Sequence, residues 1–310
     1  MSLLPKRIRE RILTKKRRLD SYRPLPPALV EQVRQGLLIE YTYSSNAIEG
    51  NTLTLGETRM IIEEGVTIGG RSVKEHLEAR NHPAAISFIE ELASQERGIA
   101  EGDVLKLHGL VMDGVDASAG RYREWGVKIS GSTFSPPPSS EVPERVSALL
   151  EWLRGNPDEL SPLELAAQLM HRFSQIHPFV DGNGRVGRLL MNLVLIRVGY
   201  PFITSISYRD RARYLRALQE ADEGNPRQLV GLIARSVEGA LDAYLRLIEE
   251  PKVYSLAEAS RRTGIDADYL GLLARRSIMP AFKRGGRWFV AEGDLKQYVD
   301  TVRRRRSVES

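Results

Sequence analysis

The feature that most constrains this chain is a polar, glycine-rich turn between two helix-forming segments, in the string HPFVDGNGRVGR at residues 177–188. Before the string, Ser161-Pro162-Leu163-Glu164 combines a capping box with proline at the first helical position, which predicts a helix running to about Ile176. Pro178 disfavours helical backbone at the preceding residue, so the helix must end there. After the turn, residues 185–199 are apolar on nearly every side, which predicts a helix buried at the centre of a bundle.

Most of the remaining chain also has apolar residues at helical spacing. This spacing predicts helices over about 26–43, 55–64, 74–92, 142–154, 210–221 and 226–249. The first of them should stop at the polar stretch Ser44-Ser45-Asn46, where we expect a loop. Between Trp125 and Phe134 the pattern changes to Val127 and Ile129 followed by glycine and prolines, which favours a short exposed hairpin. The predicted fold class is mainly α, with one β-hairpin in the centre.

Length and composition exclude several classes of function. The 310 residues, of which 42% are hydrophobic and 27% charged, are ordinary for a soluble globular protein of two or three domains. The chain has no cysteine, which excludes disulfides, thiolate metal sites and a thiol nucleophile. It also has no signal-peptide pattern and no run of about 18 apolar residues, so we expect a cytoplasmic protein without a membrane partner.

Positive charge is concentrated at the two ends of the chain. Residues 1–20 have eight Lys and Arg against two Asp and Glu, and residues 251–310 have thirteen against seven, so each end has a charge of +6. The total of +5 therefore leaves −7 for the middle. Basic ends suit nucleic acid or acidic partners, and they equally suit solvated helix faces with a frayed basic tail at residues 303–306.

The glycine-rich turn has the chemistry of a polyphosphate site. Backbone amides at a helix N-terminus, together with Arg185 and Arg188 three residues apart on one helix face, suit several phosphate groups. Asp181 is a natural Mg²⁺ ligand, because magnesium prefers one or two carboxylates plus phosphate oxygens and water. His177 can take a proton from an incoming hydroxyl near neutral pH, as phosphoryl or nucleotidyl transfer requires.

Three other interpretations of this string compete with the polyphosphate site. Gly182-x-Gly184-x-x-Gly187 formally matches the dinucleotide-binding fingerprint, but that fingerprint needs a preceding strand, and here a capped helix precedes it. The Walker pattern is absent, which excludes a P-loop enzyme. For His177 taken alone, a satisfied structural histidine is the default interpretation.

The string resembles the Fic motif, HxFx(D/E)GNGRxxR, at every defining position, and the resemblance covers roughly residues 25–248. It implies a Fic-type helical bundle with a β-hairpin flap. It also implies an enzyme that binds ATP with Mg²⁺ and transfers AMP to a Ser, Thr or Tyr hydroxyl of a target protein or of itself, releasing pyrophosphate. The GNGR form of the loop favours attack at the α-phosphate. Two alternatives stay open: a de-AMPylating enzyme that uses the same site, and a DNA-binding regulator with a nucleotide-sensing Fic domain.

The resemblance also implies roles for single residues. His177 would be the general base, Asp181 the metal ligand, and Arg188 the residue that holds the γ-phosphate. The other expected nucleotide-site residues are Gly182, Asn183, Gly184, Arg185, Val186 and Gly187 in the loop and first helical turn, Ile129, Ser130, Gly131 and Ser132 in the flap, and Tyr214 and Asp222 on the adenine side. The flap would pair with the backbone of the target. The alternatives are a hairpin that merely covers a core edge and, for Tyr214, an ordinary packed aromatic.

Residues 45–51, SNAIEGN, resemble the inhibitory pattern (S/T)xxxE(G/N) of the same family. The resemblance implies that Glu49 pairs with Arg188 and occupies the guanidinium that should take the γ-phosphate. ATP would then bind with its α-phosphate misaligned for in-line attack. The alternative is a solvent-exposed helix end with an accidental glutamate.

The composition shifts near Pro251, where we expect a second small domain. Ser255-x-x-Glu258 is a capping box, Asp266 or Asp268 can cap a second helix, and AFKRGGRWFVAE at 281–292 has the alternation of a basic hairpin. This order resembles winged helix-turn-helix domains of the excisionase type, which bind DNA or serve as docking or dimerisation modules, so DNA and a homodimer are candidate partners. The predicted domains are an N-terminal helical region with the inhibitory motif (1–95), a Fic catalytic domain (96–250) and a winged helix-turn-helix domain (251–310).

Overall fold

The computed structural model describes residues 3–25, 27–129, 134–203, 206, 208–249, 253–276, 278–284, 286–296 and 298–300. The chain divides into two compact units, Met1–Leu245 and Arg246–Ser310. The predicted boundary at residues 95 and 96 lies inside the first unit, where α4 contacts α5 across it.

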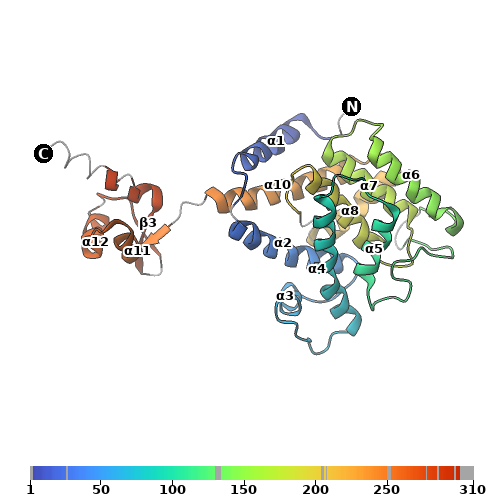
Figure 1. Cartoon of the computed structure of the whole chain (residues 1–310), viewed down its shortest axis with the longest axis horizontal. Coiled ribbons are helices and arrows are strands. Elements are labelled where there is room, and N and C mark those ends of the chain that lie inside the picture. The colour runs from blue at the N-terminus through green and yellow to red at the C-terminus, as the bar shows by residue number, and fades with distance from the viewer. Residues whose placement is uncertain are drawn as a thin grey trace. The chain divides into compact units, whose positions relative to one another are not determined.

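The first unit is helical throughout its regular structure (Figure 1), in agreement with the predicted fold class. Its α-helices are α1 (Lys6–Asp20), α2 (Pro27–Ile48), α3 (Leu55–Glu64), α4 (Val73–Ala93), α5 (Glu101–Met112), α6 (Val142–Gly155), α7 (Pro162–Ile176), α8 (Asn183–Arg197), α9 (Arg211–Asp222) and α10 (Arg227–Glu249). Two short 3-10 turns, Ser139–Glu141 and Tyr208–Asp210, precede α6 and α9. None of the helices among the described residues has both the length and the apolar character that a membrane crossing requires.

Helix α8 forms the centre of this unit, as the apolar run predicted. Every residue from Arg185 to Leu195 is buried, and α2, α4, α5 and α7 all contact the helix. Helix α7 packs closely against it, because Gly187 leaves room there: a Cβ at this position would lie 3.4 Å from Phe173. The buried arginines of the glycine-rich string therefore project from the most enclosed helix of the fold.

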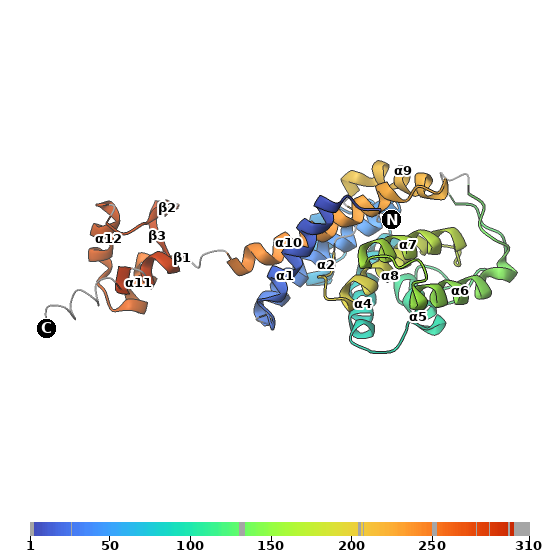
Figure 2. The same cartoon turned by 90° about the horizontal axis from the view of Figure 1, so that it is seen from above.

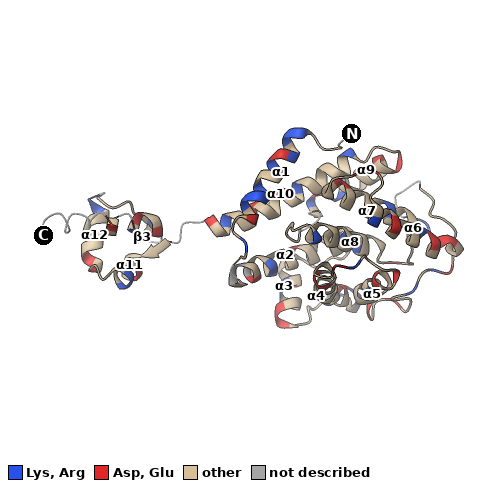
Figure 3. Ribbon diagram, turned by 45° about the horizontal axis from the view of Figure 1, so that its top comes forward, with Lys and Arg blue, Asp and Glu red and all other residues tan. Residues whose placement is uncertain are grey.

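Helix α1 lies along α10 in both views (Figures 1 and 2), and ion pairs connect the two helices. Lys15 Nζ lies 2.7 Å from Asp242 Oδ2, and Arg11 pairs with Glu238. Blue stretches of Lys and Arg recur along the α1 ribbon in Figure 3. Part of the N-terminal positive charge is thus used inside the unit, to hold α1 in place.

The sequence predicted a loop at Ser44-Ser45-Asn46, and this prediction is wrong. Helix α2 continues through these residues to Ile48. All three side chains are buried, and Ser45 accepts hydrogen bonds from Arg188. The tertiary contact replaces the water that polar helix ends usually require, so the helix gains its last turn from packing rather than from local propensity.

The predicted flap hairpin stays a prediction. Ser130, Gly131 and Ser132 lie outside the described residues. Ile129, at the edge of the described part, is half-buried, and residues 127–129 and 134–138 on either side belong to no strand.

The second unit has two helices and a small sheet. Its elements are β1 (Val253–Ser255), α11 (Leu256–Thr263), α12 (Ala267–Arg275), β2 (Phe282–Arg284) and β3 (Arg287–Ala291). The strands are antiparallel in the order β1-β3-β2, with Tyr254 opposite Val290 and Lys283 opposite Trp288. The predicted capping box of Ser255 and Glu258 opens α11, and Asp266 caps α12. Residues 292–296 and 298–300 are helical.

Candidate functional site

The turn between α7 and α8 is held in one conformation by its own residues. Asn183 clamps it, because its Oδ1 accepts the Phe179 N–H at 2.9 Å and its Nδ2 donates to the Phe179 carbonyl at 2.8 Å. Gly182 has φ +81°, and a Cβ there would lie 2.9 Å from Met112 Sδ, so only glycine fits. The backbone amides at the start of α8 are therefore presented in a fixed array.

His177 ends α7 in a left-handed conformation, with φ 48° and ψ 58°. Its Nδ1 lies 3.1 Å from the Ser174 carbonyl, which can only accept, so we place the ring proton on Nδ1. Burial lowers the pKa of His177, opposed by that hydrogen bond. The imidazole is therefore neutral near pH 7, with an unprotonated Nε2 that can take up a proton.

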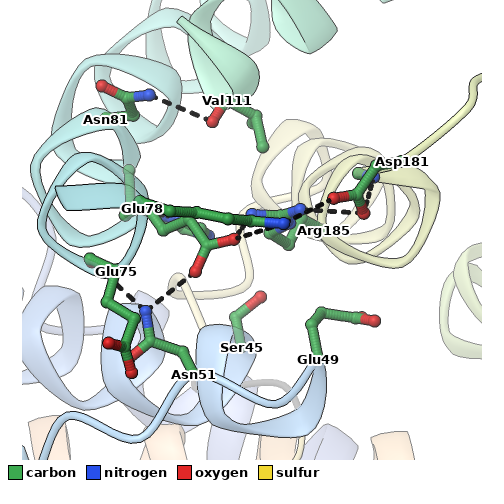
Figure 4. Close-up of polar contacts among 12 residues, drawn as sticks. Ser45, Glu49, Asn51, Glu75, Glu78, Asn81, Val111, Asp181 and Arg185 are labelled. Atoms are coloured by element: carbon green, nitrogen blue, oxygen red, sulfur yellow. Dashed lines mark hydrogen bonds and ion pairs between the residues drawn. The ribbon is translucent and has the colours of Figure 1, made fainter. Parts of the chain in front are cut away.

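Asp181 and Arg185 form an ion pair at the head of α8 (Figure 4), with Arg185 Nη2 3.1 Å from Asp181 Oδ1. Lys74 Nζ approaches the other carboxylate oxygen of Asp181 at 3.4 Å. Burial opposes ionisation of Asp181, yet Arg185, the Gly182 N–H and Lys74 together hold the pKa of the carboxyl below its usual range. Asp181 is thus an ionised carboxylate at neutral pH.

Sequence reasoning missed Glu78, which lies on the buried face of α4. Its Oε1 lies 2.9 Å from Arg185 Nη1, and its Oε2 accepts from Asn51 Nδ2 at 2.9 Å. Figure 4 shows Arg185 between Glu78 and Asp181. In the sequence, Glu78 lies between the apolar residues Leu77 and Ala79, which indicates a buried position. Because buried carboxylates are normally paired, this was the signal that could have identified Glu78 as a site residue.

His108 on α5, also missed, supports the turn from the other side. Its ring stacks on Phe179 with centroids 3.6 Å apart. Its Nδ1 accepts the Gly120 N–H at 2.9 Å, which places the ring proton on Nε2, 3.1 Å from the Asp181 carbonyl. Burial lowers the pKa of His108 to about 4. This neutral histidine therefore fixes the backbone of Asp181.

Arg188 is fully buried and is held by the last turn of α2. Its Nη2 donates to Glu49 Oε1 at 2.8 Å and to the Ser45 carbonyl at 2.9 Å, and its Nε donates to Ser45 Oγ at 3.0 Å. Burial opposes the charge of Arg188, but Glu49 raises its pKa, so it remains a cation. A methyl group at Gly184 would overlap the Glu49 carboxylate, which therefore lies directly over the glycine-rich turn.

The remaining predicted residues are buried or paired with other parts of the fold. Val186 and Gly187 are buried residues of α8, and Gly187 lies against Phe173 and Met170 of α7. Tyr214 is buried, with its hydroxyl 3.8 Å from Met170 Sδ, and burial raises its pKa. Asp222 Oδ1 lies 2.8 Å from His171 Nε2 and 3.2 Å from Gln175 Nε2, near the end of α7. An adenine-side role for Tyr214 and Asp222 stays a prediction.

Two buried arginine donors of the site have no partner among the described residues, namely Arg185 Nε and Arg188 Nη1. Buried donors without partners are costly, and they suit an anion that brings several acceptor oxygens. Next to them are a neutral histidine, an ionised carboxylate and the amides of a helix N-terminus. Together these groups can bind a charged phosphate chain and remove a proton from a nucleophile.

The fold and the site define a helical protein with an anion-binding turn at the head of its central helix. Residues 98–195 match the Fic/DOC family. A Fic domain-containing signaling protein from Bacteroides thetaiotaomicron has 30% sequence identity and a TM-score of 0.69, over 76% of this chain and 97% of that one. The chain belongs to the Fic/DOC family.

Two further relatives agree with this placement. Fic-1 from Caenorhabditis elegans has 31% identity and a TM-score of 0.70, over 78% of this chain and 73% of that structure. The protein adenylyltransferase Fic of Nematostella vectensis is 36% identical over 231 residues, which are 74% of this chain. The chain spans about half the length of that relative, 53%.

Proposed function

We propose that this chain is a protein adenylyltransferase, which transfers AMP from ATP to a Ser, Thr or Tyr hydroxyl of a target protein or of itself. The observation that supports this most is the unprotonated Nε2 of His177 beside a turn built for phosphates. Its Nδ1 is committed to Ser174, so the free nitrogen is available to an incoming hydroxyl. A sensor of nucleotide would not need this base, and the Nematostella relative is named for the same activity.

The chemistry is a nucleotidyl transfer. The target's hydroxyl oxygen forms a bond to the α-phosphorus of ATP while its proton passes to His177 Nε2. The bond from the α-phosphorus to the oxygen that bridges it to the β-phosphate breaks, and pyrophosphate leaves with that electron pair. The turn amides and the two arginines would hold the phosphates in line for this displacement.

The donor set at Asp181 fits Mg²⁺ bound together with ATP. Its side chain is 41% exposed, so the carboxylate is accessible to an ion that arrives with ATP. Within the part of the chain that the structure describes, no three His, Cys, Asp or Glu residues come together around a metal position. One carboxylate plus phosphate oxygens and water is the coordination that magnesium prefers. When bound, the ion would neutralise charge on the phosphates, and Asp181 would hold it.

Autoinhibition by Glu49 is part of this proposal. Its carboxylate accepts from Arg188 and lies over Gly184, where a γ-phosphate would need to enter. A carboxylate competes with phosphate for the same guanidinium donors, so ATP would bind with its phosphates displaced. Movement of the last turn of α2 would release Arg188 and align the nucleotide.

The test uses ATP labelled on the α-phosphate, with the Glu49→Gly variant beside the unmodified chain. Label that stays on protein, with pyrophosphate released, supports AMP transfer, and mass spectrometry of lysate proteins would identify the target hydroxyl. Label on protein only from γ-labelled ATP would instead indicate a kinase. Release of AMP from a modified protein, without transfer from ATP, would favour the de-AMPylating alternative.

A second function, DNA binding, is proposed for the C-terminal unit as part of a cytoplasmic regulator. The supporting observation is the order helix, turn, helix and two-stranded wing, with Lys283 and Arg287 on the wing and Arg275 and Arg276 at the end of α12. A positively charged wing beside a second helix suits contact with DNA phosphates. A docking or dimerisation module is the alternative.

A further inference from the structure

Arg123 has an unusual set of partners for a buried arginine. Only 2% of it is exposed, and none of the described carboxylates pairs with it. Its side chain donates to main-chain carbonyls, with Nε 2.8 Å from the oxygen of His177, Nη1 3.0 Å from that of Trp125 and Nη2 2.6 Å from that of Pro137. Its own backbone N–H donates to the Pro178 carbonyl at 3.0 Å. One planar guanidinium thus joins three separate stretches of chain.

One of these stretches is the left-handed turn that ends α7. A non-glycine residue in this conformation costs roughly 1–2 kcal/mol, and the last carbonyls of a helix lack helical partners. Arg123 binds the carbonyls of His177 and Pro178 and places a positive charge at the negative end of the helix dipole. The direction in which the His177 imidazole points therefore depends on Arg123.

The other two stretches, at Trp125 and Pro137, flank the residues within which the flap is expected. The carbonyls of Trp125 and Pro137 meet at the same guanidinium, so the chain leaves and returns at one point beside His177. Lysine could not reproduce this arrangement, because a compact ammonium on a flexible stem lacks the planar fork that reaches several carbonyls at once.

We propose that Arg123 is a positioning residue that fixes the catalytic base His177 relative to the chain at Trp125 and Pro137. The inference rests on the proposed function, in which His177 takes the proton of the target's hydroxyl. Arg123 meets the start of the turn through the carbonyls of His177 and Pro178. It acts by holding the imidazole of His177 in register with Trp125 and Pro137.

The experiment compares Arg123→Lys and Arg123→Gln with the control Arg197→Lys. Arg197 also donates to a main-chain carbonyl, that of Leu92 at 3.1 Å, but on the far end of α8 from the turn. We expect kcat for AMP transfer to fall about 100-fold in both Arg123 variants, because a small misplacement of a reacting group lowers the rate by about this factor. ATP affinity should stay unchanged within about twofold, because the residues that bind phosphate remain in place. Arg197→Lys should at most lower the stability of the fold. At a temperature where this variant is folded, its kcat should equal that of wild type.

A pH profile separates positioning from a general loss of structure. The charged groups that shift the pKa of His177 are Arg123, Glu49 and Asp181. Arg123 lowers the pKa of His177, whereas the two carboxylates raise it. Arg123→Gln removes that charge and should raise the pKa of His177, moving the acid limb of kcat/KM to higher pH. Arg123→Lys keeps the charge and should leave the limb in place while kcat falls.

The His177 titration, followed by NMR of the imidazole, needs no activity and therefore tests the inference independently. If neither wild type nor Glu49→Gly transfers AMP, the proposed function fails, while a raised His177 pKa in Arg123→Gln still supports contact between the two residues. Folded Arg123 variants with wild-type kcat and an unmoved titration would overturn the positioning role. If Arg123→Gln does not fold, Arg123→Lys decides: wild-type kcat overturns the proposal, and a reduced kcat with normal ATP affinity supports it.

Discussion

Glu49 Oε1 lies 2.8 Å from Nη2 of Arg188, a guanidinium with no exposed surface. Ser45, in the last turn of α2, takes two further hydrogen bonds from the same arginine. Glu49 follows directly after the helix, and its N–H donates to the Asn46 carbonyl at 3.0 Å, so one displacement of this C-terminal end of α2 would free Arg188 from both residues. An anion that enters the site must therefore compete with α2 as well as bind to α8.

The first prediction concerns Glu49→Gly. Removing the carboxylate leaves Arg188 free for the γ-phosphate and should increase AMP transfer or auto-modification about 5- to 150-fold, the effect of a coupling of about 1–3 kcal/mol. Transfer is measured with α-labelled ATP on protein that still binds nucleotide. Glu64→Gly, at the exposed end of α3, is the matched control and should change nothing.

The gain should depend on Arg188. In the double variant with Arg188→Ala the increase should disappear, because the vacated position no longer has a γ-phosphate anchor, so the two changes should be strongly non-additive. Unchanged or reduced transfer in Glu49→Gly would refute the inhibitory role and favour Glu49 as a residue required for removal of AMP.

The second prediction concerns His177→Ala. Transfer should fall about 10²- to 10⁴-fold, the usual effect of losing a positioned general base, while ATP affinity changes little because the turn and arginines remain. Calorimetric titration with ATP and a transfer assay on the same sample measure both quantities. Wild-type transfer by this variant would rule out the mechanism.

Local signals explain which parts of the fold could be predicted. The bounds of α7 follow from a capping box and from Pro178, and both act within a few residues. The end of α2 was predicted too early, because the burial of Ser45 depends on Arg188, which is far away in the sequence. Propensity cannot anticipate such a contact.

The same distinction applies to the site. The residues of the string itself could be named because their chemistry is contiguous. Glu78 and His108 could not, since each meets the turn only through tertiary packing, Glu78 through Arg185 and His108 through Phe179. The apolar neighbours of Glu78 indicate a buried, paired carboxylate, but no local pattern indicates that the partner of Glu78 or of His108 lies in the turn.

The third prediction concerns the C-terminal unit. If Lys283 and Arg287 contact DNA phosphates, binding in a gel-shift assay should be measurable near 50 mM salt and fall steeply as salt rises. Replacing both with alanine should reduce the slope of log affinity against log salt by about 1.8, roughly 0.9 for each lost contact. Arg145→Ala in the first unit is the control. Absence of binding at low salt would favour a docking module.

The last prediction follows from two histidines that are buried in the neutral form. Burial lowers the pKa of His82 to about 3 and that of His108 to about 4, whereas an unfolded histidine titrates near its ordinary value of 6.5. Below that value the unfolded chain binds protons that the folded chain does not, so stability falls as pH falls, by up to about 1.4 kcal/mol per pH unit for each histidine. Carboxylates with lowered pKa, such as Glu75, act mainly below about pH 4.5, so between pH 6 and 5 the histidines dominate.

Urea unfolding at pH 7, 6 and 5 measures this slope directly. Wild type should lose up to about 2.7 kcal/mol per pH unit below pH 6, from His82 and His108 together, with His177 adding to it. His82→Leu removes one of these protonation sites, so it should flatten the slope by up to about 1.4 kcal/mol per pH unit even though it lowers stability at pH 7 through the lost bond to the Glu78 carbonyl. A slope in His82→Leu equal to that of wild type would mean that His82 is not held neutral in the folded chain.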